Sequence, residues 1–183
     1  DSDFPGTAYL IPDADRVTMW RALWAFKGKP AIDIAWTGGL QWTGAKFRRL
    51  SLSSLAPLMR AVNAHWVVLE YKDRREDVAE FKAAHPDIDI AVYPETAAHD
   101  YDMTAALVAS LDRVVSMQTA VIHLAGALGV PCECLVSMSS QWRYGIDCDD
   151  IPWYRSVTLH RQARDGTWPL ERIEGLMRLR YGG

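Results

Sequence analysis

The stretch RVVSMQTAVIHLAGALGVP, residues Arg113–Pro131, decides the fold. It opens on Arg113–Ser116, a short run with two β-branched residues that predicts a buried strand. The run after it carries an apolar stripe at helical spacing, formed by Val121, Leu124, Ala125 and Leu128. Gly129 and Pro131 are typical of a helix end. A strand that leads directly into a helix is the repeating unit of a parallel sheet.

The same alternation extends outward along the chain. Strand-like runs lie at Ala31–Trp36, Trp66–Glu70, Asp89–Tyr93, Arg113–Ser116 and Cys132–Val136, with a weaker sixth at Val157–Leu159. Helical patterns separate most of them and also flank the set. They lie at 13–28 with Asp13 as cap, at 55–62 with Ser53 or Ser54 as cap, from Asp73 as cap to a stop before Pro86, at 103–111 and at 170–179. This order predicts an α/β fold, a Rossmann-like doubly wound and mostly parallel sheet with flanking N- and C-terminal helices. We expect a linker at 1–12 and a single Rossmann-like domain at 13–183.

Composition and charge exclude several classes of protein. The chain has 183 residues, 49% hydrophobic and 23% charged, which is typical of a globular domain. Its net charge is −3 and its 20 Lys and Arg residues are dispersed, so we expect no nucleic-acid partner. No apolar run approaches the roughly 18 residues of a membrane span. The N-terminal Asp1–Gly6 reads like a linker, so we expect a piece of a longer protein.

The cysteines indicate a reducing compartment. Cys132, Cys134 and Cys148 are odd in number, and Cys-x-Cys is poor zinc spacing, so neither a disulfide framework nor a metal site is expected. Cys132 and Cys134 should share one face of a strand as buried free thiols. We therefore expect a cytoplasmic protein.

A ligand of an open parallel sheet lies beyond the carboxyl ends of its strands. The turn after the first strand nearly imitates a phosphate loop, because Gly39 and Gly44 have the right separation. Ala45 stands where lysine is required and Lys46 where serine or threonine belongs, so the motif fails. What remains suits an anion weakly, and a flexible loop with solvated charges is an equal alternative.

The turn before His123 is more specific. On a helical wheel His123 points away from the apolar stripe and shares its face with Thr119 and Gly126. It lies near a helix N-terminus, which favours an anion and a neutral imidazole. The alternative is an exposed and uninvolved histidine. Weaker candidates are the acidic run Asp147–Asp150 and the aromatic runs Gln141–Tyr144 and Pro152–Tyr154, which could stack on a base or sugar or could dock the C-terminal helix.

Residues Thr104–Leu107, Leu111–Ser116 and Thr119–Pro131 carry a family resemblance. They resemble the C-terminal, donor-binding domain of GT-B glycosyltransferases of the heptosyltransferase type (glycosyltransferase family 9). More closely they are similar to the domain that follows tetratricopeptide repeats in many bacterial proteins. Further stretches agree with that second group, at Ile34–Gly38, Arg49–Leu52, Gln141–Gly145 and Pro152–Tyr154.

The resemblance implies a nucleotide-diphosphate sugar as ligand and substrate, and neither a cofactor nor a bound metal. It implies that the donor diphosphate contacts Thr37, Gly38, Lys46, Arg48, Gln118, Thr119, Ala120 and His123. It implies that the base and ribose lie near Glu70, Tyr71, Tyr101 and Asp102. The chain departs from the family's Asp-Ser/Thr-Gly at Gln118-Thr119-Ala120.

The family's acceptor-binding half, which supplies the usual catalytic base, lies N-terminal to this region. The resemblance therefore implies a donor-binding domain of a metal-independent inverting glycosyltransferase, inactive by itself and with no catalytic residue assignable in this chain. The alternative is a non-catalytic nucleotide-binding or scaffold module of a tetratricopeptide-repeat protein with a degenerate site.

Overall fold

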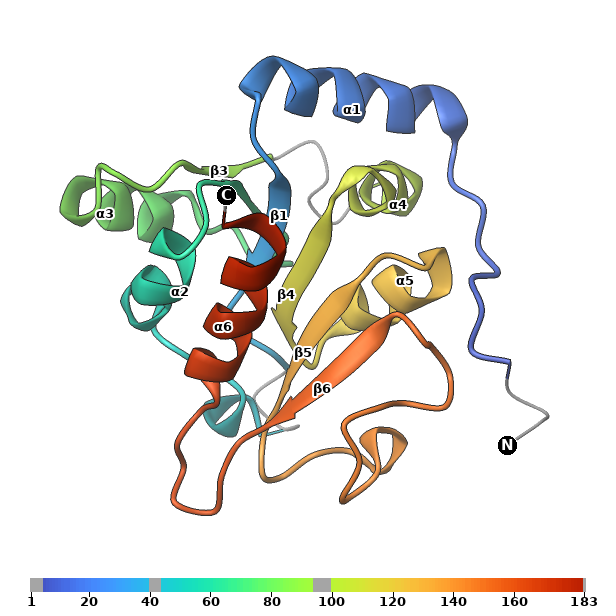
Figure 1. Cartoon of the computed structure of the whole chain (residues 1–183), viewed down its shortest axis with the longest axis vertical. Coiled ribbons are helices and arrows are strands. Elements are labelled where there is room, and N and C mark those ends of the chain that lie inside the picture. Colours follow the sequence, from blue (N-terminus) through green and yellow to red (C-terminus); the bar gives the residue numbers. More distant parts are fainter. Residues whose placement is uncertain (1–4, 40–43, 94–99, 183) are drawn as a thin grey trace.

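Six parallel strands form one sheet at the centre of the molecule (Figure 1). The computed structural model describes residues 5–39, 44–93 and 100–182. The strands are β1 (Ala31–Ala35), β2 (His65–Val68), β3 (Ile90–Val92), β4 (Arg113–Met117), β5 (Cys132–Val136) and β6 (Val157–Arg161). They lie in the order β3-β2-β1-β4-β5-β6, and every neighbouring pair is parallel. The predicted α/β fold with a parallel sheet and flanking helices is confirmed.

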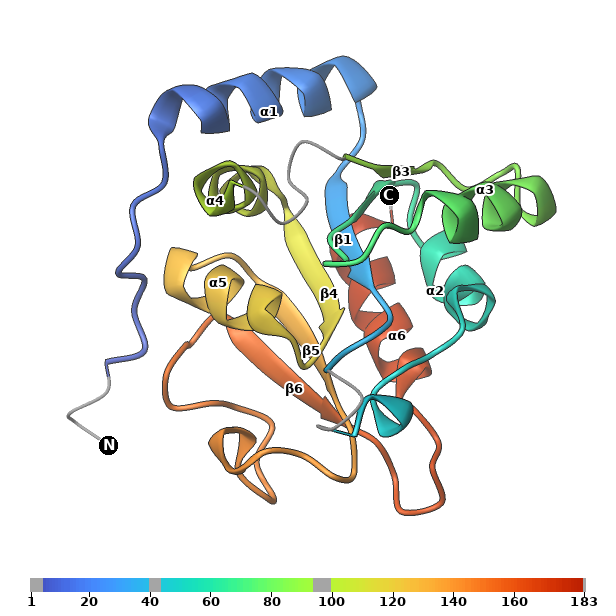
Figure 2. The ribbon, with the colours of Figure 1, turned by 180° about the vertical axis from the view of Figure 1, so that it is seen from behind.

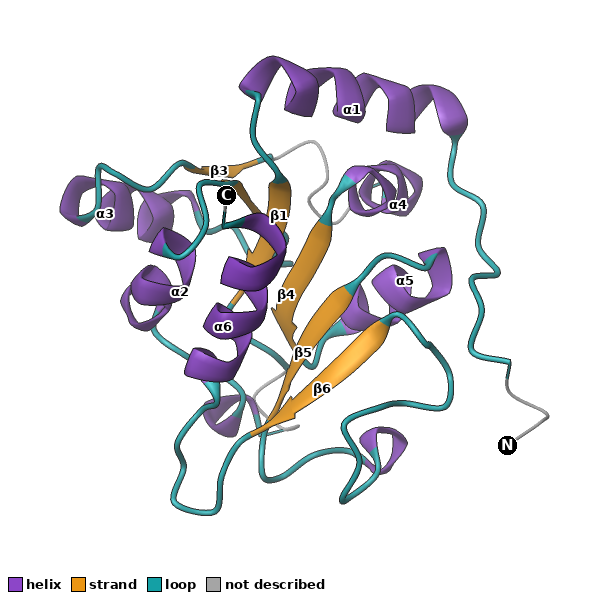
Figure 3. Ribbon diagram, viewed as in Figure 1, coloured by secondary structure: helices purple, strands orange, loops and turns teal. Residues whose placement is uncertain are grey.

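Helices cover both faces of this sheet (Figures 2 and 3). They are α1 (Ala14–Lys27), α2 (Ala56–Arg60), α3 (Arg75–Ala84), α4 (Tyr101–Ser110), α5 (Ala120–Leu128) and α6 (Leu170–Tyr181). Buried side chains of α1, α4 and α5 form one hydrophobic core with one face of the sheet. Those of α2, α3 and α6 form a second core with the other face. None of the described helices is long and apolar enough to cross a membrane.

The strand order reverses between β1 and β4. The chain runs from β1 outward to β3, then returns to β4 beside β1 and runs outward again to β6. Ala35 of β1 pairs with Ser116 of β4, so these two strands end side by side. The loops that follow them diverge to opposite faces of the sheet, which leaves a crevice at this switch point.

The N-terminal part of the chain packs along the sheet face that α5 covers. Asp13 caps α1 by accepting a hydrogen bond from the Arg16 amide at 2.9 Å, as predicted. The backbone amides of Tyr9 and Leu10 both donate to the carbonyl of Ala127 on α5. The ring of Tyr9 stacks on that of Tyr154, with centroids 6.4 Å apart.

Two elements differ from the sequence prediction in their bounds. Residues 55–62 do not form one helix, because a 3₁₀ turn at Leu52–Leu55 precedes a short α2 that has Pro57 in its first turn. Ser51 caps this segment, in place of Ser53 or Ser54, by accepting from the Ser54 amide at 3.2 Å. The weak sixth strand is real and extends to Arg161. Pro57 explains the break between the 3₁₀ turn and α2, because proline fixes its own φ and has no amide hydrogen to donate.

The apolar stripe of α5 also differs from the prediction. Ile122, Leu124 and Ala125 are buried, whereas Val121 and Leu128 are only partly buried. The side that carries Gly126 is buried as well, because the ring of Tyr154 lies directly over it. A Cβ at Gly126 would lie 2.2 Å from Tyr154 Cγ, so only glycine fits here.

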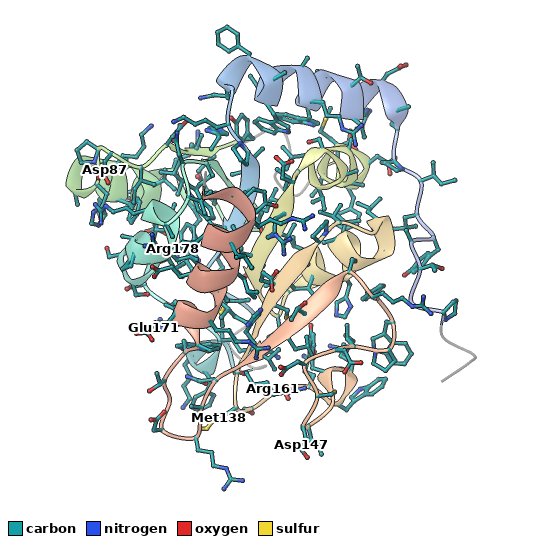
Figure 4. All side chains as sticks on the ribbon, viewed as in Figure 1. Asp87, Met138, Asp147, Arg161, Glu171 and Arg178 are labelled. Carbon is teal, nitrogen blue, oxygen red and sulfur yellow. The ribbon has the colours of Figure 1, made fainter. Side chains whose placement is uncertain are left out.

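The long loop between β5 and β6, residues 137–156, is the segment that covers α5. Arg161 on β6 holds it, donating to the carbonyls of Cys148 at 2.9 Å and Gly145 at 3.4 Å and to that of Tyr144. Figure 4 shows Arg161 at the end of its strand, beside the loop that carries Asp147. One guanidinium therefore ties three backbone positions of the loop to the edge strand.

A buried ionic cluster lies beneath α6. Glu133 of β5 contacts Arg113 of β4 and accepts a hydrogen bond from His160 Nε2 of β6 at 2.6 Å. Arg113 also donates to the Tyr181 hydroxyl of α6 at 3.3 Å. Burial raises the pKa of Glu133, but the hydrogen bond from His160 and the charge of Arg113 outweigh it and lower the pKa. On the opposite face Cys132 and Cys134 are buried free thiols, as predicted.

Candidate ligand pocket

A pocket of about 640 Å³ opens at the switch point. Its walls come from the loops after β1, β2, β4 and β5, which is where the topology predicts a ligand. The lining residues are Thr37, Gly39, Arg48, Leu69, Glu70, Tyr71, Gln118, Thr119, Ala120, Val121, His123, Gln141, Arg143 and Tyr144.

Glu70 fixes the wall that follows β1. Its carboxylate is buried and accepts from the amides of Trp36 at 2.8 Å and Thr37 at 2.7 Å, and from the Thr37 hydroxyl. The Thr37 hydroxyl in turn accepts from Arg74 Nη2 at 2.9 Å. Its proton is thus committed to Glu70, and the threonine presents only a lone pair to the pocket.

Gly38 brings this wall against the turn after β4. A Cβ on Gly38 would lie 3.4 Å from the Gln118 carbonyl oxygen and 3.4 Å from Thr119 Cγ2. The Gly38 amide donates to the Arg48 carbonyl at 2.8 Å. The backbones of the two loops therefore contact each other at the crevice floor, and Gly38 supports the pocket without lining it.

The start of α5 forms the opposite wall. Thr119 is its N-cap residue and makes no side-chain capping bond, so its side chain satisfies none of the first-turn amides. Ala120 is exposed at the first helical position. No acidic residue lies in the first turn. Free amides and the positive end of the helix dipole favour an anion at this point.

His123 lies one turn into α5, on the wall nearest the β5–β6 loop. Its Nε2 is 3.2 Å from the Tyr144 hydroxyl, and its ring centroid is 5.8 Å from the rings of Tyr144 and Tyr154. Burial lowers the pKa of His123, and the positive charge of Arg143 lowers it further. The neutral imidazole expected from the sequence is therefore supported, but the ring is covered by aromatic residues on one side.

Two arginines give the pocket its positive charge. Arg48 is 4% exposed and reaches the pocket from the loop after β1. Arg143 reaches it from the β5–β6 loop and stacks over Trp142, with its Cζ 5.9 Å from the ring centroid. Lys46 lies outside, with its ammonium 4.8 Å from the exposed Phe47 ring.

Most of the residues that the sequence singled out meet in this pocket. Thr37, Arg48, Glu70, Tyr71, Gln118, Thr119, Ala120 and His123 all line it. Gly38, Lys46, Tyr101 and Asp102 do not. Tyr101 and Asp102 are the first residues of α4, which follows the edge strand β3 and so begins away from the switch point. The side chain of Tyr101 is 61% exposed. Leu40–Thr43 of the phosphate-loop-like turn and Pro94–His99 of the turn before α4 lie outside the described residues.

Sequence reasoning ranked the β5–β6 loop too low. Gln141, Arg143 and Tyr144 line the pocket, and Tyr144 and Tyr154 pack on α5, so these aromatic runs do not dock α6. The available signal was their position after β5, the neighbour of β4 in the sheet. Within the described ranges no three His, Cys, Asp or Glu side chains gather in a way that could hold a metal ion.

Comparisons with known proteins bear on the fold that carries this pocket. No protein-family profile matches the chain. Protein FlbA of Caulobacter vibrioides is 32% identical over 166 residues, an alignment that takes in 88% of this chain and 27% of FlbA. The chain is thus distantly homologous to FlbA and spans about a quarter of its length.

Three solved structures share the fold. The E. coli ADP-heptose lipopolysaccharide heptosyltransferase II has a TM-score of 0.65 at 14% identity, over 93% of this chain and 52% of that one. A glycosyl transferase of family 9 from Veillonella parvula has a TM-score of 0.58 at 10% identity, over 85% and 43%. The E. coli heptosyltransferase WaaC, solved with ADP, has a TM-score of 0.55 at 11% identity, over 87% and 46%. The chain has the fold of one half of such a GT-B enzyme and spans about half their length.

Proposed function

We propose that this chain is the donor-binding domain of a metal-independent inverting glycosyltransferase and binds a nucleotide-diphosphate sugar. The observation that carries the proposal is the pocket at the β1/β4 switch point, with the start of α5 on one wall and Arg48 and Arg143 on the others. We further propose that the complete activity requires an N-terminal acceptor domain, and that tetratricopeptide repeats accompany it in the parent protein.

The diphosphate would lie at the start of α5. The first-turn amides and the helix dipole stabilise negative charge there, and the two arginines add full positive charges. The same groups would stabilise the diphosphate as it leaves the sugar, which is why the proposal needs no metal ion. Leu69 and Tyr71 would then contact the nucleoside, since they line the β2 side of the same pocket.

The solved structures support this assignment by their fold. Two of them are heptosyltransferases, and WaaC was solved with ADP. A nucleoside diphosphate is therefore a ligand of a protein that shares this architecture.

Isothermal titration of the folded chain with UDP, GDP, ADP and CMP tests the proposal. We expect at least one nucleoside diphosphate to bind, and binding by none of the four nucleotides would contradict the proposal. The sharpest variant is Ala120→Glu, which places a carboxylate at the first position of α5. We expect binding to be lost while the melting temperature is kept, because an acidic residue in a first turn suits the helix dipole.

Ala14→Glu is the matched control for this variant. Ala14 is likewise an exposed first residue of a helix, α1, and lies outside the pocket. It should leave both binding and stability as in the wild type. Equal binding by wild type and Ala120→Glu would remove the ligand from the start of α5.

A second candidate is a nucleotide-binding module without catalysis. It is favoured by the state of the two pocket side chains that could act as a base, since Glu70 accepts three hydrogen bonds and His123 contacts the Tyr144 hydroxyl. A nucleotide that binds the complete parent protein without any transfer or hydrolysis of its sugar would favour this candidate. Transfer by the complete parent would favour the glycosyltransferase.

A further inference from the structure

Gln118 is the last residue before the N-cap of α5, and its side chain is held in one orientation. Gln118 is 3% exposed, and its Oε1 accepts from the Ser137 amide at 2.6 Å. Ser137 directly follows the buried end of β5, so this donor is fixed by the sheet. A flipped amide would set an NH₂ group against the Ser137 N–H, which is repulsive.

The other end of this amide has no partner. Gln118 Nε2 is buried and makes no hydrogen bond to any described residue, although Gln118 lines the pocket. An unsatisfied buried donor costs free energy, so its retention calls for a reason. Because Oε1 already accepts from Ser137, the unpartnered group that this side chain holds for a ligand is its NH₂.

The surroundings of Gln118 favour a charged acceptor. The next residues along the chain are the uncapped start of α5, and Arg48 and Arg143 line the same pocket. The one carboxylate among the lining residues, Glu70, is engaged by the loop after β1. The positive charge of the described pocket thus lies around an amide whose unpartnered group is a donor.

We propose that Gln118 is a specificity-determining residue, which selects a ligand with a negatively charged phosphate or carboxylate oxygen at the floor of the pocket. The inference rests on the proposed function only in taking this pocket as the ligand site. It goes beyond it by assigning the amide nitrogen to an anionic oxygen. A phosphate would come from the diphosphate, and a carboxylate from an acidic sugar.

The side-chain amide of Gln118 is itself the reporter. In a ¹H–¹⁵N spectrum its NH₂ pair is assigned by its disappearance in Gln118→Glu. Inorganic pyrophosphate, glucose 1-phosphate and glucuronic acid 1-phosphate are then titrated, with glucose as the neutral reference. We expect a saturable downfield shift of this pair with the anionic probes and none with glucose.

The three anionic probes separate the two sources of charge. A shift with pyrophosphate and glucose 1-phosphate assigns Gln118 to a phosphate oxygen. A shift with glucuronic acid 1-phosphate alone assigns it to a carboxylate, and either result supports the proposal. A pair that stays in place while amides of α5 respond to the same probes would overturn it.

Gln118→Glu tests selectivity directly. The isosteric carboxylate keeps an oxygen for the Ser137 amide, so the fold should hold, and it replaces the donor with a negative charge. We expect affinity for the probes that shift the amide pair to fall at least tenfold. The matched control is Asn63→Asp, which adds the same charge at an exposed position. Asn63 lies just before β2, at the amino end of that strand, whereas the pocket lies beyond the carboxyl ends.

Equal affinities of wild type and Gln118→Glu would overturn the inference. Failure of this inference and of the proposed function can be told apart. If nucleoside diphosphates bind without shifting the Gln118 NH₂ signals, the proposed function would stand and the role of Gln118 would fall. If the Gln118 NH₂ signals respond to pyrophosphate but the chain binds no nucleotide, the role of Gln118 would stand and the proposed function would fall.

Discussion

The carboxylate of Glu70 shows how a side chain can line a pocket and yet be unavailable to a ligand. The family resemblance placed it beside the ribose. In the structure its oxygens accept from two backbone amides and one hydroxyl of the loop after β1. Its position at the pocket follows from the end of β2, but its partners follow from a loop 33 residues away, which no local pattern reveals.

His123 is expected to contribute to ligand binding. Replacing it with alanine should weaken nucleoside diphosphate binding by about 1 to 3 kcal/mol, the scale of a hydrogen bond to a charged group. Calorimetric titration of His123→Ala against wild type measures this. An unchanged dissociation constant would show that the imidazole does not reach the ligand.

The pH dependence of stability should report the same imidazole. The pKa of His123 is lowered from 6.5 in the folded chain, mainly by burial and then by Arg143, so the unfolded chain binds the proton more readily. Its contribution to stability is therefore complete above pH 6.5 and is lost as the pH falls toward the folded pKa. The pKa of His65 is lowered in the same direction, also mainly by burial.

We therefore expect the free energy of unfolding to fall as the pH drops below 6.5. In His123→Gln, which cannot titrate, the fall should be shallower because the share of His123 is gone while that of His65 remains. Urea unfolding at a series of pH values from neutral to acidic gives both slopes. Identical slopes would mean that His123 keeps its ordinary pKa in the folded chain.

At the scale of elements, α5 is shaped by the loop that covers it. Gly126→Ala would drive a methyl group into the Tyr154 ring, and we expect a loss of about 1 to 3 kcal/mol of stability, as for an overpacked core. Gly175→Ala on α6 is the matched control, because a Cβ there meets nothing within 4 Å. It should stabilise the chain by about 0.5 to 1 kcal/mol through helix propensity. Urea unfolding of the two variants should give opposite signs, and equal effects would contradict the packing of Tyr154 on α5.

Arg161 is the residue that should decide whether this loop stays in place. A lysine cannot reach three carbonyls at once, so Arg161→Lys should loosen residues 144–148. Chymotrypsin should then cleave after Trp142 or Tyr144 faster than in the wild type. Arg164→Lys, in the exposed turn after β6, serves as the control. Equal cleavage rates in all three proteins would show that other contacts hold the loop.

Much of this architecture could be predicted from the sequence, and the limits have physical causes. The strand and helix periods are local, so the runs from Ala31 to Val136 and the caps at Asp13 and Gly129 could be identified correctly. The switch-point rule then placed the turns after β1 and β4 together, and both line the pocket. The fold of the β5–β6 loop depends on long-range contacts, such as those of Arg161 and Tyr154, and these carry no periodic signal.

At the scale of the whole molecule, the ionic cluster under α6 ties together three strands and a helix. Glu133→Gln would leave Arg113 and His160 without their carboxylate in a buried setting. We expect a loss of about 3 to 5 kcal/mol, the usual cost of removing one partner of a buried ion pair. Urea unfolding measures it, and a change below about 1 kcal/mol, as for a surface pair, would show that the cluster is well hydrated.

The stacked rings of Tyr9 and Tyr154 have a mechanical consequence. Tyr9 belongs to the extended segment before α1, and Tyr154 rests against both α5 and the ring of His123. Force applied along that segment is thus delivered to the wall of the pocket through the Tyr154 ring and through the two backbone hydrogen bonds to α5. We expect the segment to act as a lever, so that tension at one margin of the domain becomes a change in the shape of the pocket.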